Sequence, residues 1–215
     1  VFMQIKFFPG RLSAWLICFI LSFALVCVLS VFAEQTEQIV NVLVTYHSTS
    51  GNTEKMALAV AKGAESVPGT RVRIERVSKV TAGLLFSSDA LVVGSPVYWA
   101  NMAGEVKMFF DDWQFKFGVW PEFKMRNKVR AAFTTGGQVS GGKEVTMLTI
   151  LAAMLSNQMI VVSGGGAFGA SATTEGKSPG IDQDELADAR ALGKRVAETA
   201  RMVKRGLVRQ SNVSK

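Results

Sequence analysis

Apolar, β-rich runs alternate with amphipathic helical stretches from residue 39 to residue 204, and this alternation restricts the fold more than any other feature. The predicted strands are Ile39–Tyr46, Arg71–Val77, Ala90–Gly94, Lys128–Thr134 and Met159–Ser163. The predicted helices are Thr53–Ala64, Ala103–Trp113, Gly142–Ser156 and Asp184–Lys204. Strands separated by helices predict an α/β fold: a doubly wound, five-stranded parallel sheet with helices on both faces. Ligands of such sheets bind beyond the carboxyl ends of the strands.

An uncharged apolar run, Leu12–Ala33, precedes this region and is long enough to cross a bilayer core, which needs about 20 apolar residues. Lys6 and Arg11 precede the run, and acids follow it, so the positive-inside rule sends the rest of the chain across the membrane. We expect residues 1–33 to be a signal peptide or an N-terminal membrane anchor formed by a hydrophobic helix. The protein is then membrane-anchored or exported to the extracytoplasmic, periplasmic face; it is cytoplasmic if this segment is not used.

The net charge of +7 suggests nucleic acid or an anionic membrane, but the charge is concentrated at the two ends of the chain. Residues 194–215 hold seven basic residues against Glu198, whereas residues 34–193 hold 15 basic and 16 acidic residues. We therefore expect no nucleic-acid partner. The sequence divides into the N-terminal segment, a domain at 39–205 and a basic C-terminal tail at 206–215, either solvated or in contact with anionic lipid.

Cysteine and histidine usage excludes several kinds of site. Both cysteines, Cys18 and Cys27, lie in the apolar run, and His47 is the single histidine. A zinc site, an iron–sulfur cluster or a cysteine nucleophile in the domain therefore lacks its ligands. We expect no metal.

A loop rich in hydroxyl groups follows the first predicted strand and opens a helix. It reads Ser48, Thr49, Ser50, Gly51, Asn52 and Thr53. Backbone N–H groups and hydroxyls at a helix N-terminus form a phosphate cradle, and the absence of Lys or Arg from the loop favours a phosphate monoester. The alternative is an ordinary helix cap, but a cap needs one hydroxyl and this loop has four.

Two further loops follow the third and fourth predicted strands. The first contains Pro96, Val97, Tyr98 and Trp99, whose aromatic rings can stack on a flat conjugated ring or pack within the protein. The second contains Thr134, Thr135, Gly136, Gly137, Gln138 and Ser140, and its glycines permit a close backbone approach to a ligand.

Two glycine patterns nearby are chance matches to nucleotide-binding motifs. Gly137–Lys143 fits the P-loop spacing, but Glu144 stands where that motif needs Ser or Thr. Gly164, Gly166 and Gly169 fit the dinucleotide fingerprint, but no helix is predicted to open after them.

The ordered set of loops resembles a known family. VLVTYHSTSGNTEKMA resembles the flavodoxin-like FMN phosphate signature. The segments GSPVYWANMAGEVKMFFD, TTGGQVSGGKEVTMLTILAAML and GASATTEG resemble the WrbA-type NAD(P)H:quinone oxidoreductases and the NADPH-dependent FMN reductase group. The resemblance covers about residues 39–200 and implies a flavodoxin-like sheet of strand order 2-1-3-4-5.

The resemblance also implies FMN as the cofactor, NAD(P)H as a co-substrate, a quinone as the acceptor and a homo-oligomer, either dimer or tetramer. Residues 48–53 would bind the FMN phosphate, and residues 96–99, 134–138 and 140 would lie along the flavin. Tyr98 and Trp120 are the candidate catalytic residues, Trp120 because it resembles an aromatic that closes over the substrate.

Two other functions stay open at this point. One is a flavodoxin-style electron carrier, exported and using a donor other than a nicotinamide. The near-neutral domain argues against it, because carriers of this family resemble each other in acidic docking faces. The other is a cofactor-free adaptor, against which the hydroxyl-rich loop argues.

Overall fold

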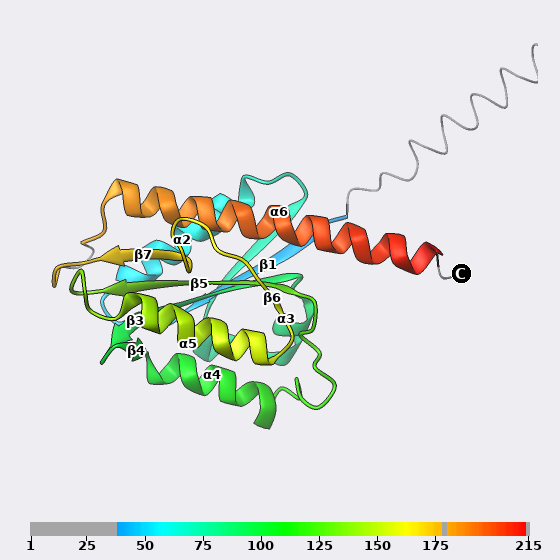
Figure 1. Cartoon of the computed structure of the whole chain (residues 1–215), viewed down its shortest axis with the longest axis horizontal. Coiled ribbons are helices and arrows are strands. Elements are labelled where there is room, and N and C mark those ends of the chain that lie inside the picture. Colours follow the sequence, from blue (N-terminus) through cyan, green and yellow to red (C-terminus); the bar gives the residue numbers. More distant parts are fainter. Residues whose placement is uncertain (1–37, 178–179, 214–215) are drawn as a thin grey trace, which may run out of the picture. The chain divides into compact units, whose positions relative to one another are not determined.

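A parallel sheet is the centre of the computed structural model, which describes residues 38–177 and 180–213 (Figure 1). Its strand order is β2-β1-β3-β5-β6, and all four neighbouring pairs are parallel. These strands are β1 (Val40–Tyr46), β2 (Thr70–Arg76), β3 (Ala90–Tyr98), β5 (Val129–Gly136) and β6 (Ile160–Val161). Counted in chain order, they follow the predicted order 2-1-3-4-5, so the flavodoxin-like α/β sheet is confirmed.

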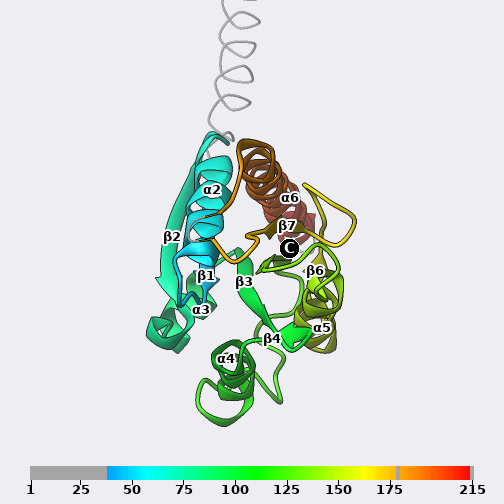
Figure 2. The same ribbon diagram turned by 90° about the vertical axis from the view of Figure 1, so that its left-hand side faces the viewer.

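Helices cover both faces of this sheet (Figure 2). Helices α2 and α6 pack on one face around Val44, Met56 and Leu192, and α4 and α5 pack on the other around Leu91 and Ile150. The helices are α2 (Asn52–Glu65), α3 (Ala82–Ser87), α4 (Gly104–Phe115), α5 (Lys143–Ser156) and α6 (Gln183–Val213), with a 3-10 turn η1 at Val77–Lys79. The four long helices were predicted, whereas α3 and η1 were not, because each is too short to show a hydrophobic period.

Two glycines let α2 and α6 approach closely. A Cβ on Gly63 would lie 1.9 Å from the carbonyl oxygen of Arg190, and one on Gly193 would lie 1.9 Å from that of Val60. Since no side chain fits in either place, these glycines fix the α2–α6 crossing and hold α6 over β1 and β5.

The fifth strand differs from the prediction. The continuous strand expected at Met159–Ser163 is only the two-residue β6, and a further strand, β7 (Ala170–Thr173), lies in the predicted glycine-rich loop. Both pair with β5, β6 at its start and β7 at its carboxyl end. β7 could not be recognised from its sequence, ASAT, because this sequence lacks the large β-branched and aromatic residues that are typical of a strand. No helix follows Gly169, as expected for a chance dinucleotide motif.

The last helix extends past the predicted end of the domain. Helix α6 continues through residues 206–213, so the domain boundary expected at 205 falls inside a helix. The predicted hydrophobic helix at 1–33 lies outside the described residues. Across residues 38–177 and 180–213, none of the helices has the length and apolar composition to span a membrane.

Candidate functional site

The three predicted loops meet at one edge of the sheet, where β1, β3 and β5 end side by side. Thr53, after β1, and Thr135, in β5, join their Oγ1 atoms at 2.8 Å in a buried hydrogen bond. Thr134 Oγ1 donates to the carbonyl oxygen of Ser95 in β3 at 2.7 Å. The threonines expected to contact a ligand therefore bind the loops to one another.

The loop after β1 divides into residues that hold its shape and residues that face outward. The buried Ser48 accepts the backbone N–H of Gly51 on its Oγ at 3.1 Å. Gly51, with φ of 85°, precedes α2, and the helix begins there without a side-chain cap. Thr49 and Ser50 are exposed beside these first amides of α2. Gly51, at the N-cap, has no side chain to cap α2, and a helix N-terminus flanked by hydroxyls suits an anion.

The segment after β7 supports this loop and was not predicted to do so. Asn52 donates from Nδ2 to the carbonyl oxygen of Lys177 at 2.9 Å and accepts the N–H of Gly180 at 3.1 Å. Both amide atoms of Asn52 are therefore bound to backbone more than a hundred residues away. Because the side chain of Asn52 holds the loop, only its backbone N–H is left for the predicted contact with a phosphate.

A cation does contact the loop, although none lies within it in the sequence. Arg76, the last residue of β2, donates from Nη1 to the carbonyl oxygen of Ser48 at 2.7 Å and pairs with Glu54 at 2.8 Å. It also lies over the ring of Tyr46. Burial raises the pKa of Tyr46, and its hydrogen bond with Glu54 raises it further. The strand pattern RVRIERV could have identified Arg76, since it ends β2 beside β1.

The segment predicted as a loop after β3 is a β-hairpin. β3 extends to Tyr98, and β4 (Asn101–Met102) pairs with it in an antiparallel ladder. The two turn residues have positive φ angles, 52° for the fully exposed Trp99 and 59° for Ala100. A two-residue turn with both φ angles positive normally contains Asn-Gly. Gly142 packs against it, since a Cβ there would lie 2.7 Å from the Cα of Ala100.

The glycine-rich loop after β5 completes the edge. Gly136 is buried against Val97 and Lys143, whereas the remaining predicted residues, Gly137, Gln138 and Ser140, are exposed. Lys143 is buried and its ammonium group donates to Thr173 Oγ1 on β7. Lys143, the lysine of the apparent P-loop motif, therefore makes its hydrogen bond within the fold. This is expected if the match to that motif is a chance one.

A polar cluster lies where the first loop meets the hairpin. Tyr98 Oη lies 2.9 Å from Thr49 Oγ1, and His47 Nε2 lies 3.3 Å from the same oxygen. Glu105, in the first turn of α4, lies 3.6 Å from His47 Nε2. The candidate catalytic residue Tyr98 is therefore joined to the hydroxyl loop. The partner of His47, Glu105, was not predicted.

Trp120 lies apart from these loops. It follows the carboxyl-terminal end of α4, whereas the hairpin precedes the start of that helix, which is about 18 Å long. Trp120 is exposed and lines a groove of about 730 Å³ between α4 and α5, together with Phe110, Trp113 and Phe123. The groove reaches Asn101 and Met102 of the hairpin, so Trp120 shares a groove with β4 but does not join the polar cluster. Its predicted catalytic role stays a prediction.

No cluster of three or more His, Cys, Asp or Glu residues that could hold a metal ion occurs in the described part of the chain. The groups at the carboxyl edge are hydroxyls, backbone amides and aromatic rings, with Arg76 bound to the first loop. This set is chemically suited to a phosphate group attached to a flat ring system.

Comparison with known proteins identifies the family of this chain. The model of the family described as NADPH-dependent FMN reductase matches residues 79–174. An NAD(P)H dehydrogenase (quinone) of Paracoccus denitrificans is 32% identical over 209 residues, covering 80% of this chain and 99% of the relative. The chain belongs to the flavodoxin-like NADPH-dependent FMN reductase family.

Other members of this flavodoxin-like group bear both names. A flavodoxin of Aquifex aeolicus is 37% identical over 166 residues, covering 73% of this chain and 85% of the relative. The solved structure of a flavodoxin, WrbA-like protein from Agrobacterium tumefaciens matches with a TM-score of 0.64 at 28% identity, over 76% of this chain and 98% of that one. The family is therefore the one that the ordered loops resembled.

Proposed function

We propose that this protein is an FMN-dependent oxidoreductase that passes two electrons from NAD(P)H to a quinone. The observation that carries the proposal is the meeting of the hydroxyl loop, the aromatic hairpin and the glycine loop at the carboxyl edge of β1, β3 and β5. The relatives named NAD(P)H dehydrogenase (quinone) support the same reaction.

The first loop fits the phosphate of FMN. Thr49, Ser50 and the first amides of α2 would hold it, because this helix begins without a side-chain cap. The positive end of the helix dipole adds an attraction for an anion. Glu54, in the first turn of α2, would oppose a phosphate, but Arg76 pairs with it at 2.8 Å and offsets its charge. Arg76 thereby supplies the cation that the loop itself lacks.

The hairpin and the glycine loop fit the ring system. Val97, Tyr98 and Trp99 present apolar and aromatic surface, and Gly137, Gln138 and Ser140 of the neighbouring loop are exposed. Bound FMN would supply the hydride chemistry, and the chain would bind it, orient it and exclude water from it.

Reduction of a quinone also requires protons, and the polar cluster contains groups that can deliver them. Tyr98 Oη and His47 Nε2 both contact Thr49 Oγ1, so a proton can pass along these three side chains. Glu105 faces His47 Nε2 and holds the ring toward the loop. In this proposal Tyr98 positions the acceptor, and Trp120, in the α4–α5 groove, has no part in the step.

The test begins with reconstitution of the full chain with FMN, followed by steady-state oxidation of NADH and NADPH in the presence of benzoquinone. We expect flavin absorbance that stays with the protein on gel filtration, and turnover that requires both the nicotinamide and the quinone. Stable FMN binding without nicotinamide oxidation would instead indicate the electron-carrier function. Two of the relatives are named flavodoxin. Absence of FMN binding would leave the adaptor.

A further inference from the structure

Exposed cations gather at the edge of the sheet opposite the flavin site, where the parallel strands begin. We define the basic edge by six exposed residues that form no ion pair with a carboxylate among the described residues. They are Lys62, Arg71, Lys124, Arg126, Arg205 and Arg209. Glu65, Asp89 and Glu122 are the acids near them, and Asp89 is already bound by Lys204. The basic edge therefore has an excess of positive charge.

The opposite edge carries acids at the helix starts, of which Glu54 is paired with Arg76. Each long helix begins there with an acid in its first turn: Glu54 in α2, Glu105 in α4, Glu144 in α5 and Asp184 in α6. The fold thus separates its charges along the strand direction, although residues 34–193 are nearly neutral as a whole. A body with this polarity orients itself in front of an anionic surface.

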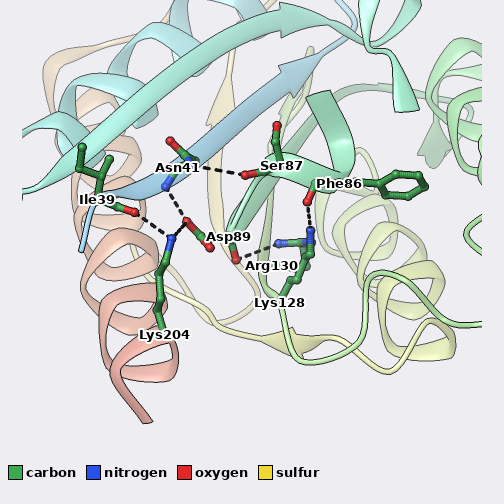
Figure 3. Close-up of polar contacts among 8 residues, drawn as sticks. All are labelled: Ile39, Asn41, Phe86, Ser87, Asp89, Lys128, Arg130 and Lys204. Atoms are coloured by element: carbon green, nitrogen blue, oxygen red, sulfur yellow. Dashed lines mark hydrogen bonds and ion pairs between the residues drawn. The ribbon is translucent and has the colours of Figure 1, made fainter. Parts of the chain in front are cut away.

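The end of α6 projects beyond the basic edge (Figure 1). Lys204 marks where it leaves the sheet, since Lys204 Nζ donates to the carbonyl oxygen of Ile39 at 2.9 Å and to Asp89 Oδ2 at 2.8 Å (Figure 3). The nine residues from 205 to 213 then extend about 14 Å further. Met202 (65% exposed) lies just before this end and Leu207 (47% exposed) within it, together with the exposed Arg205 and Arg209.

The same edge is where the chain arrives from the uncharged run 12–33. Ile39, held by Lys204, is six residues after Ala33, so the linking segment spans at most about 22 Å when fully extended. Residue 39 therefore follows the uncharged run closely in the sequence.

We propose that the basic edge and the projecting end of α6 dock on the anionic surface of a lipid bilayer. Basic side chains near such a surface are attracted to acidic headgroups, and exposed apolar side chains enter the interface. A nucleic acid would use the cations but would leave Met202 and Leu207 in water. In the docked orientation the flavin-site edge faces the aqueous phase, which keeps it open to soluble reductants. The docking itself does not depend on which reaction the site performs.

The test is a lipid titration of the full chain against vesicles of phosphatidylcholine alone and of phosphatidylcholine with phosphatidylglycerol. The measured quantity is the ratio of the two partition coefficients, because any charge-independent insertion of the apolar run cancels in that ratio. We compare the wild type with R205Q/R209Q and with a matched control, K194Q/R195Q, which removes two exposed cations from the same helix before it leaves the sheet. Each basic residue at the surface accounts for roughly a fivefold change in partitioning.

The proposal predicts a higher coefficient for the anionic vesicles, reduced by about tenfold or more in R205Q/R209Q and little changed in the control. Equal partitioning of the wild type into both kinds of vesicle, or an equal loss in the control, would overturn it. Hydrogen exchange of the vesicle-bound full chain gives an independent readout. The amides of residues 205–213 should be protected only by the anionic vesicles, and unchanged exchange there would also overturn the proposal. FMN binding, measured separately, should be the same for all three proteins.

Discussion

Thr53 and Thr135 lie 82 residues apart in the chain, and their buried Oγ1 atoms are 2.8 Å apart. This hydrogen bond joins the start of α2 to β5, so the hydroxyl-rich loop after β1 and the glycine-rich loop after β5 are one structural unit.

Substitution of one threonine should therefore be more harmful than substitution of both. Thr53→Val leaves the hydroxyl of Thr135 buried without a partner, which costs about 1–3 kcal/mol, whereas replacing both partners by valine is nearly neutral. We expect T53V to lower the free energy of unfolding by about 1–2 kcal/mol in urea titrations of the apoprotein, and T53V/T135V to lower it less. A double variant that loses the sum of the two single effects would show that the hydroxyls do not interact.

Arg76 should control FMN affinity from outside the loop. Arg76→Gln removes the hydrogen bond to the carbonyl oxygen of Ser48 and leaves Glu54 unpaired near the expected phosphate. We expect the Kd for FMN, from quenching of flavin fluorescence, to rise about tenfold, which corresponds to roughly 1.4 kcal/mol. The control is Arg73→Gln on the same strand, whose ion pair with Glu75 lies away from the loop. Equal weakening by both substitutions would indicate a general effect of charge.

The hairpin turn should become more stable when its strain is removed. Ala100 has a φ of 59°, and a left-handed conformation costs an L-residue roughly 1–2 kcal/mol, which glycine avoids. We expect Ala100→Gly to raise the free energy of unfolding by about 1 kcal/mol. Gly142→Ala should lower it, since its φ is 95° and the new Cβ would meet Ala100. A lower free energy of unfolding in A100G would show that the turn is not strained at Ala100.

Lys128 should make the fold more stable in mildly alkaline solution. Burial, and after it the charge of Arg130, lowers the pKa of Lys128 to about 8, so the unfolded chain binds more protons between pH 8 and about 10.4. Stability therefore rises with pH in that range. After allowance for solvent screening, we expect the free energy of unfolding to increase by about 1 kcal/mol from pH 7 to pH 9, and Lys128→Met to abolish the increase. An unchanged increase in K128M would assign it to another group.

The sequence was sufficient for the parts of the fold that obey a clear periodicity. The four long helices and the order of the main strands follow from runs such as IVNVLVTY and from the rule that parallel strands need crossover helices. It was insufficient for the β3–β4 hairpin, because Trp99-Ala100 does not resemble the Asn-Gly that such a turn normally requires. The ladder between β7 and β5 could not be predicted, because the small residues of β7 show no strand pattern and the pairing depends on tertiary contacts.

The candidate site shows the same division. The three loops were identified because their residues lie consecutively after strands, and parallel strands place them together. The roles within the loops could not be assigned, because Asn52 and Thr53 find their partners more than eighty residues away. Arg76 and Glu105 were missed for the same reason, since each reaches the site from another element. Trp120, assigned by resemblance, lies in the α4–α5 groove.

The most direct measurement of the central claim is the visible spectrum of the FMN-reconstituted full chain, first mixed anaerobically with NADPH and then with benzoquinone. We expect NADPH to bleach the protein-bound flavin absorbance and benzoquinone to restore it within the turnover time. A flavin spectrum that NADPH and NADH both leave unchanged would contradict the oxidoreductase assignment.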